Sequence, residues 1–329
     1  MKSSILLTIF LLLVPLAGLA PAVELTPFQT RNLSPTALPY GLAVAESPKT
    51  LAAHQAELRI SFDVANIATI GTAQQETIVL DAETYVTTLG LRYGLNRRLQ
   101  IGLDVPYVKH DGGVLDGFIN DWHDFFQLPT GDRDKLADDQ LNLNYVRSGV
   151  TGFDITESQS GIGDLRLSLI WSVLQKEAST GAVKLLVKAP TGEPDDLTGS
   201  GAWDVSLAYL GQYDFSLPAS QASVWAGLAG TLLGEGEVLE DRVKDWTVSG
   251  WLGAGWAPLD WLALKLQLDG HSALYDSDLS ELGDPALMLT MGGTLAFGER
   301  TSLDLGVGED LAVVASPDIT FQLALRHRF

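Results

Sequence analysis

Charged residues that alternate with apolar ones are the groups in this sequence best placed to bind or move a polar molecule. In residues 262–271 every second residue from Leu262 to Leu268 is leucine, and Lys265, Asp269 and His271 lie between or just after them. Such a period of two gives a β-strand one apolar and one polar face. If the apolar faces meet lipid, the polar faces line a lumen with these candidates: Glu57, Arg59, Asp63, Arg92, Asp104, Asp164, Arg166, Lys184, Lys188, Asp204, Lys265, Asp269, His271, Asp304, Arg326 and Arg328.

The charges of this expected lumen nearly balance. The set holds eight basic and seven acidic residues, with His271 neutral. A selective pore often carries one sign of charge at its narrowest point. Buried charges also need partners, so a packed, ion-paired interior would give the same balance. Both interpretations stay open.

A second set of polar residues follows a helical spacing. Apolar residues recur from Leu115 to Phe126 as on one face of a helix of about three turns. If the alternating strands close into a barrel, such a helix either folds into the mouth of that barrel and constricts it, or lies over the rim and covers apolar surface. The constriction candidates are Asp116, Phe118, Trp122, His123 and Asp124.

Catalysis has little support in the sequence. A hydrolase could be built on His123 or His271 with a nearby aspartate, but it would need a nucleophile, and no serine stands out beside His123. The sequence therefore favours a protein that is not an enzyme, and it predicts no cofactor.

Acidic residues gather in the segments expected to face outward. They suit divalent cations that bridge to lipopolysaccharide phosphates, because Ca²⁺ and Mg²⁺ prefer oxygen ligands. Solvated loops that keep the surface soluble are the alternative, and no metal can be assigned. The residues are Glu193, Asp195, Asp196, Glu235, Glu237, Glu240, Asp241, Asp276, Asp278, Glu281 and Asp284.

Twelve segments with period-two alternation must position these groups. Short and long connections alternate between them, as in an outer-membrane antiparallel β-barrel with tight periplasmic turns and long external loops. A soluble closed barrel of twelve strands would have an interior too wide to fill with side chains. The expected strands are 54–66, 76–94, 98–110, 161–175, 182–190, 201–215, 221–233, 244–257, 260–272, 285–297, 301–310 and 317–329.

Two irregularities are expected within this pattern. The strand 76–94 changes phase near Asp81 to Glu83, which predicts a β-bulge. The long external loop 111–160 contains a further hairpin, around 142–145 and 153–156, that extends outside the membrane.

The two ends of the chain predict export. Lys2 and the apolar run from Ile5 to Ala20 form a signal peptide, residues 1–22, cleaved after Ala22. Residues 23–53 are rich in proline and form an extended arm, periplasmic or inserted in the lumen, before the barrel of residues 54–329. The last strand ends at Phe329, which suits edge pairing with the barrel-assembly machinery.

Composition limits the remaining function classes. The chain has 329 residues, with 41 acidic residues against 21 basic ones, so nucleic-acid phosphates would be repelled. It has no cysteine, which excludes disulfides and thiolate metal sites.

Several motifs resemble an uncharacterised family, a domain of unknown function, of bacterial outer-membrane proteins. Its members carry the pattern GG-x-LD-x-FI-x-x-[WF]-H ahead of a Leu-Pro and an Arg-Asp. The resemblance implies location and fold, and no functional residue. The matching residues are Gly112-Gly113-Val114-Leu115-Asp116-Gly117-Phe118-Ile119-Asn120-Asp121-Trp122-His123, Leu128-Pro129, Arg133-Asp134, Tyr93-Gly94-Leu95, Gly161-Ile162-Gly163-Asp164-Leu165, Ala189-Pro190-Thr191-Gly192, Gly199-Ser200-Gly201 and Pro317-Asp318-Ile319.

These observations predict an all-β transmembrane barrel with one short helix in a long external loop, in the outer membrane of a Gram-negative bacterium. A narrow channel or uptake protein for a small solute fits the polar strand faces best. The Pro-Thr-Gly motif also resembles broader barrel families linked to uptake of aromatic or fatty compounds. A non-conducting surface barrel with an ion-paired lumen is the alternative, and a membrane-embedded hydrolase is the third.

Overall fold

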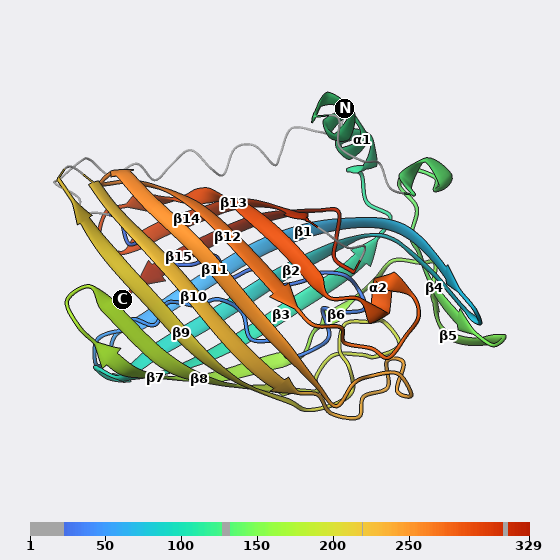
Figure 1. The fold of residues 1–329 in the computed structure, drawn as a ribbon, viewed down its shortest axis with the longest axis horizontal. Helices are drawn as coiled ribbons and strands as arrows, with labels where there is room; N and C mark the ends of the chain where they lie inside the picture. Colours follow the sequence, from blue (N-terminus) through green and yellow to red (C-terminus); the bar gives the residue numbers. More distant parts are fainter. Residues whose placement is uncertain (1–22, 127–131, 219, 312–314) are drawn as a thin grey trace, which may run out of the picture.

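A computed structural model describes residues 23–126, 132–218, 220–311 and 315–329, with the side chains of residues 122–126 left out. Twelve antiparallel strands close into a barrel (Figure 1). They are β1 (Ala56–Ala73), β2 (Glu76–Asn96), β3 (Leu99–Asp111), β7 (Leu165–Gln175), β8 (Ser179–Ala189), β9 (Asp204–Leu217), β10 (Ser220–Leu232), β11 (Trp246–Leu259), β12 (Leu262–His271), β13 (Ala286–Phe297), β14 (Thr301–Asp310) and β15 (Ile319–Arg328).

The predicted fold class is confirmed. Each strand pairs with its neighbour in the chain, β3 pairs with β7, and β15 pairs with β1 to close the barrel. Short turns join the strands at one end, here named the turn end, and the long connections lie at the other, the loop end, together with the short turn between β1 and β2. The prediction of cleavage after Ala22 falls on residues 1–22, outside the described residues.

The apolar faces of the strands point outward. On β12, Leu264 and Leu266 are 47% and 50% exposed, whereas Lys265 between them is 4% exposed. This inverts the arrangement of a soluble β-barrel, whose apolar residues fill the interior. The outer surface is therefore suited to lipid.

The expected hairpin is present and lies beyond the barrel wall. β4 (Asn142–Arg147) and β5 (Val150–Ile155) pair with each other, and β4 pairs with the part of β2 nearest the loop end. β6 (Gln159–Ile162) continues the wall beside β3.

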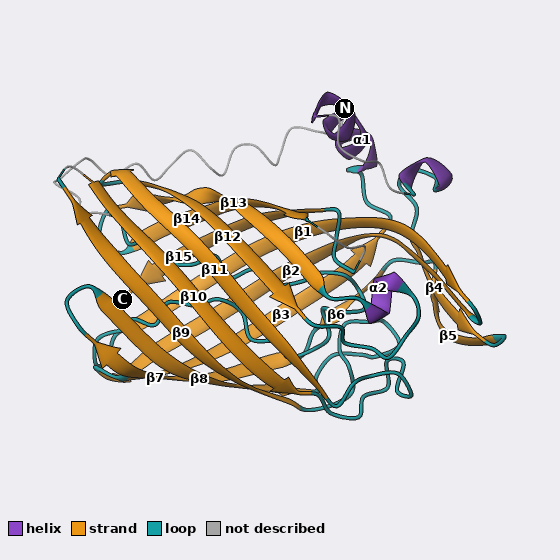
Figure 2. Ribbon diagram, in the orientation of Figure 1, coloured by secondary structure: helices purple, strands orange, loops and turns teal. Residues whose placement is uncertain are grey.

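The helices are few and short. They are α1 (Asp116–Phe126), the 3₁₀ turn η1 (Arg133–Lys135) and α2 (Ser280–Gly283), all at the loop end (Figure 2). No helix in the described part of the chain is long and apolar enough to cross a membrane.

The predicted bulge near Asp81 to Glu83 is wrong. β1 and β2 pair without a break from Ala56 and Tyr93 to Ala73 and Glu76, and β2 instead shifts register against β3 between Gly94 and Asn96. The polarity of the two strand faces reverses near these residues, but the backbone alternation does not. Asp81 and Glu83 face outward near the loop end, where Glu83 accepts hydrogen bonds from the backbone at the start of α1.

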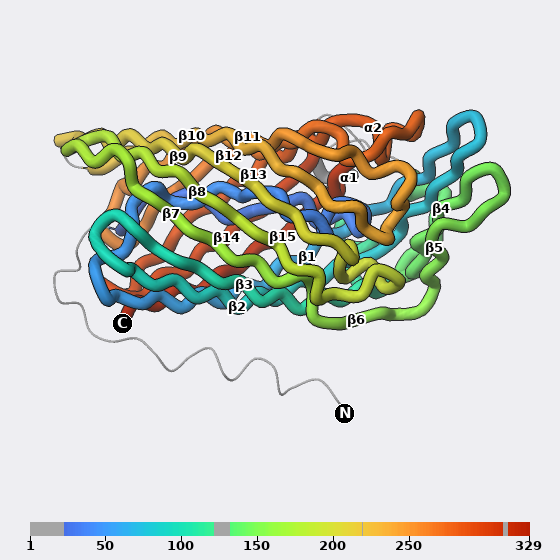
Figure 3. Tube along the Cα trace, turned by 90° about the horizontal axis from the view of Figure 1, so that it is seen from below, coloured from blue at the N-terminus to red at the C-terminus, as the bar shows by residue number. Residues whose placement is uncertain are grey.

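Residues 23–53, here named the plug, pass through the inside of the barrel before β1 begins. Figure 3 shows this segment in blue between the strands of the two walls. The side chains of Phe28 and Ala45 are completely buried there. Of the two placements expected for this arm, periplasmic or luminal, the structure has the luminal one, because side chains of the barrel wall hold it along its length.

Candidate functional site: a charged lumen filled by the plug

The first pass of the plug runs from the turn end to the loop end beside β12. Val23 donates its backbone N–H to the Asp260 carbonyl oxygen in the β11–β12 turn, 2.7 Å away. Further along, every second residue of the plug contacts every second residue of β12. Phe28, Thr30 and Asn32 are held in turn by Gln267, Asp269 and His271. This constant spacing of two residues on each side shows that the first pass is extended, as the run of prolines predicts.

The hydrogen bonds of this pass come from the wall's side chains. Gln267 accepts from the Phe28 N–H at 3.0 Å, and Asp269 accepts from the Thr30 hydroxyl at 2.8 Å. The Asn32 amide donates to Nε2 of His271 at 3.0 Å, which leaves Nδ1–H of His271 to donate to the Ser272 carbonyl. Both ring nitrogens of His271 therefore have partners, Asn32 of the plug and Ser272 of the wall.

The plug turns at residues 34–40, near the loop end. Tyr40 and Tyr275 meet there edge to face, with ring centroids 5.8 Å apart. Burial raises the pKa of the Tyr275 phenol well above its usual range, so it stays protonated and donates to the Thr36 carbonyl oxygen at 2.7 Å.

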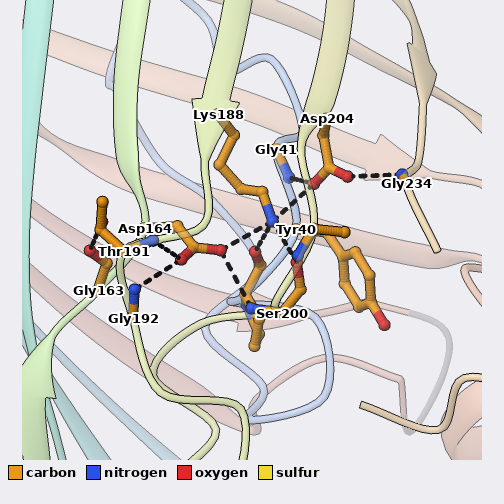
Figure 4. Close-up of polar contacts among 12 residues, drawn as sticks. Tyr40, Gly41, Gly163, Asp164, Lys188, Thr191, Gly192, Ser200, Asp204 and Gly234 are labelled. Atoms are coloured by element: carbon orange, nitrogen blue, oxygen red, sulfur yellow. Dashed lines mark hydrogen bonds and ion pairs between the residues drawn. The ribbon is translucent and has the colours of Figure 1, made fainter. Parts of the chain in front are cut away.

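Lys188 anchors this turn from the barrel wall (Figure 4). Its ammonium group lies 2.8 Å from an Asp164 oxygen and 3.1 Å from an Asp204 oxygen, and all three side chains are buried. It also donates to the Ser200 hydroxyl and to the Pro39 carbonyl oxygen of the plug.

The two carboxylates extend this anchor to the neighbouring loops. Asp164 accepts hydrogen bonds from the backbone N–H groups of Thr191, Gly192 and Ser200, and Asp204 accepts from Gly41 of the plug at 2.7 Å. Three of the motifs that carry the family resemblance, around residues 161–165, 189–192 and 199–201, therefore meet at one buried site.

The second pass returns to the turn end past a different wall. The Glu46 carboxylate lies 2.8 Å from Nε of Arg92 and 2.6 Å from Nζ of Lys184. Nearer the turn end, Lys49 pairs with Asp214 at 2.7 Å, and the Leu51 N–H donates to Gln100 at 3.0 Å.

The structure places fourteen of the sixteen lumen candidates among its buried side chains, while Glu57 and Arg328 are partly exposed at the turn end. Beyond the groups above, Asp304 pairs with Lys265 at 2.8 Å and with Arg326 at 3.4 Å. Arg166 donates to the Leu38 carbonyl oxygen of the plug. The candidates thus contact one another and the plug.

The β9–β11 side of the lumen is apolar instead. Trp225 and Trp251 pack with small wall residues and with Ala43 and Ala45 of the plug. A Cβ added at Gly253 would lie 2.2 Å from the Trp225 ring, so this glycine makes room for the indole. The glycine-and-aromatic pairing of these strands is a packing device.

We expect Gly253→Val to destabilise the folded protein by about 1–3 kcal/mol, because overpacking forces the Trp225 ring away from its site. Urea unfolding in lipid vesicles, followed by tryptophan fluorescence, measures this. Gly230→Val is the matched control, since a Cβ there meets nothing within 4 Å. Equal losses in the two variants would contradict the packing argument.

Of the two placements expected for the loop helix, in the mouth or over the rim, the contacts of Asp116 and Phe118 favour one outside the mouth. Asp116 accepts from Asn66 at 2.8 Å, and Phe118 contacts the Phe321 ring with centroids 6.2 Å apart. Both partners lie on outward faces of β1 and β15, so α1 begins outside the wall. The side chains of Trp122, His123 and Asp124 lie outside the described residues. An amphipathic pattern shows that a helix covers an apolar surface but not which one.

The acidic residues of the loops are partly engaged with the protein itself. Glu281 is buried beside Thr69, and Asp241 pairs with Arg147. In the described ranges there is no group of three or more His, Cys, Asp or Glu side chains that could hold a metal ion.

Sequence reasoning missed the plug residues that complete the site. Glu46, Asn32 and Gly41 lie in a segment without periodicity, which carries no signal for its partners. One clue was present, because Glu24 and Glu46 are the only acidic residues of 23–53, and an exported arm inserted in a lumen with eight bases would pair them.

Two of the cavities that border the first pass are small, whereas a third, at the turn end beside Val23 and Glu24, holds about 290 Å³. Of the two small cavities, one, beside Arg31 and Trp251, holds about 30 Å³, and the other, beside Arg31 and Gln322, holds about 20 Å³. Each of these two has room for about one water molecule.

Comparison with known proteins identifies the family. Residues 3–329 match the family model described as a protein of unknown function, DUF3187. The chain belongs to this family. A search of curated proteins finds no match.

Solved structures similar to this DUF3187 chain include the COG4313 outer membrane channel from Pseudomonas putida F1. That comparison has a TM-score of 0.58 and 15% identity, and covers 86% of this chain and 98% of that chain. The transport unit of the autotransporter AIDA-I from Escherichia coli gives a TM-score of 0.47 and 8% identity, covering 83% and 89%. The first likeness supports the barrel fold.

Proposed function

We propose that this DUF3187 protein is a narrow outer-membrane channel for a small solute, which its own plug holds closed. The observation that carries the proposal is a polar, twelve-stranded lumen filled by a chain segment that forms no strand of the barrel. A barrel of this size is narrower than the 16 to 18 strands of general porins, so it suits a selective path rather than a wide pore.

The contacts of the plug support a removable segment. Wall side chains, such as Gln267, Asp204 and Gln100, supply hydrogen bonds to its backbone. Water can replace each such bond when the segment leaves, whereas a strand of the barrel could leave only by breaking a continuous ladder.

The proposed location is the outer membrane of a Gram-negative bacterium, with the turn end in the periplasm. The lipid-suited exterior and the signal-peptide pattern of residues 1–22 support it. Recognition by the barrel-assembly machinery through the last strand, and contact of the acidic loops with lipopolysaccharide through divalent cations, belong to the same proposal. Membrane fractionation and N-terminal sequencing test it, with Val23 expected as the first residue.

A non-conducting barrel is the second candidate, because the ion-paired lumen and the small internal cavities favour it. In that case the plug is a permanent core, and the acidic loops carry the function. The two candidates differ in what happens when the plug is removed or locked.

We expect deletion of residues 23–51 to produce steady conductance in planar bilayers, whereas the full mature chain is closed or opens briefly. The physical reason is that the deletion empties a polar lumen while leaving the barrel's hydrogen bonds in place. Heat-modifiable mobility in gel electrophoresis checks that the variant folds.

A reversible lock supplies the matched control. Thr30→Cys with Asp269→Cys joins the plug to β12 where their side chains touch, in a chain that has no other cysteine. We expect any openings to stop on oxidation and to return on reduction. Silence of the folded deletion variant would sink the channel proposal and favour the permanently packed barrel.

A further inference from the structure

We infer that Arg92 and Lys184 form a binding site for the carboxylate of a small solute, and that Glu46 of the plug occupies this site when the protein is closed. The inference rests on the proposed function and deepens it, because it names the chemical class of the solute. The plug then acts as a built-in competitor of that solute.

The two cations converge on one carboxylate. Oε1 of Glu46 lies 2.8 Å from Nε of Arg92, and Oε2 lies 2.6 Å from Nζ of Lys184. All three side chains are at least nine-tenths buried. Charge-assisted hydrogen bonds of this length are roughly twice as strong as neutral ones, so the site is specific for an anion.

The site is preorganised by the wall and does not depend on Glu46 for its shape. Arg92 is held by Asp104, which accepts from its two terminal nitrogens at 2.9 and 3.0 Å. This fork fixes the guanidinium plane and leaves Nε aimed into the lumen. Binding sites whose donors are fixed in advance lose little entropy when a ligand arrives.

The positive charge of Lys184 makes the site favour an anion. Within the described residues, its ammonium group has Glu46 as its only ion-pair partner. When the plug leaves, water can solvate this cation, and an anion that binds both Arg92 and Lys184 regains the charge-assisted hydrogen bonds that Glu46 made. A carboxylate solute can do so with the same two oxygens.

The surroundings define the rest of the solute. Next to Glu46, Ala45 and Ala43 pack against an apolar patch formed by Ile170, Ala182, Ala208, Leu210, Trp225, Ala229 and Trp251. The plug therefore presents a carboxylate beside small apolar groups. The same surface would accept a carboxylate joined to a short alkyl chain or one aromatic ring, with the indole rings as its contacts.

Chemical rescue tests the site without any measurement of conductance. Glu46→Ala removes the carboxylate and leaves room beside Arg92 and Lys184. We expect acetate, which matches the four heavy atoms that the substitution removes, to raise the melting temperature of this variant by about 2–4 °C at saturating concentration, through binding to the folded state alone. Acetamide, which has the same size without the charge, should leave it unchanged.

Two further variants make the assignment specific. Glu24→Ala is the matched control, since Glu24 also pairs with an arginine, Arg328, but at a site one-third exposed to water. We expect no rescue there. Glu46→Ala combined with Lys184→Met should lose the rescue seen in the single variant.

If Glu46→Ala does not fold, Glu46→Gln replaces it, because the amide keeps the space filled. Benzoate, a carboxylate with one aromatic ring, should then change the tryptophan fluorescence of the protein at a concentration at least tenfold lower than in the wild type. Rescue by acetamide, rescue of Glu24→Ala, or equal benzoate sensitivity of Glu46→Gln and the wild type would overturn the inference. Rescue in a protein that stays silent in bilayers would keep the carboxylate site and reject the channel.

Discussion

Lys188→Met is expected to destabilise the folded barrel by about 3–5 kcal/mol, the cost of removing one partner from a buried ion pair. The substitution leaves the Asp164 and Asp204 carboxylates buried without their shared cation. It also removes the donor to the Pro39 carbonyl oxygen, so the turn of the plug loses its anchor. Urea unfolding in lipid vesicles measures the loss.

Lys49→Met is the control for this prediction. Lys49 also pairs a plug residue with a wall aspartate, but its side chain is 35% exposed and that of Asp214 is 32% exposed. Exposed pairs contribute about 0–1 kcal/mol, so this variant should be nearly as stable as the wild type. A similar loss in both variants would mean that burial does not set the strength of these pairs.

Leu266→Arg is expected to impair insertion by about 2–4 kcal/mol, because the new charge would face lipid near the middle of β12. Leu266→Ala keeps the site apolar and should insert normally. The yield of heat-modifiable, folded protein in vesicles measures both. Normal insertion of Leu266→Arg would mean that the outward face of β12 does not meet lipid.

Lys265, the residue next to Leu266, shows that knowing which way a side chain faces is not enough to predict the stability of a variant. Because Lys265 lies on the polar face of β12 and does not meet lipid, the sequence alone predicts that Lys265→Ala leaves assembly intact. In the structure Lys265 pairs with Asp304 at 2.8 Å and lies over the Phe28 ring of the plug, 3.8 Å from its centroid. We therefore expect Lys265→Ala to destabilise the protein, although Arg326 remains beside Asp304 and limits the loss.

The sequence by itself determined the barrel. A period of two is a local property, so the alternation of Leu262 to Leu268 with Lys265 and Asp269 specifies strand, inward face and outward face together. The alternation of short turns and long connections then orders the strands, because antiparallel neighbours need only a tight turn. Even the hairpin of β4 and β5 was predictable in this way.

Only the tertiary structure decided what fills the lumen and where the loop helix lies. Phe28 and Gln267 are 239 residues apart, and the hydrogen bond between them leaves no pattern near either one. Glu46 gives no local indication that it pairs with Arg92 and Lys184. The amphipathic spacing of α1 predicted its helix but not its partner, and Asn66 and Phe321 place it outside the wall. Local periodicity sets which face of an element is apolar, whereas side-chain pairs distant in the chain form only once closure of the barrel brings them together.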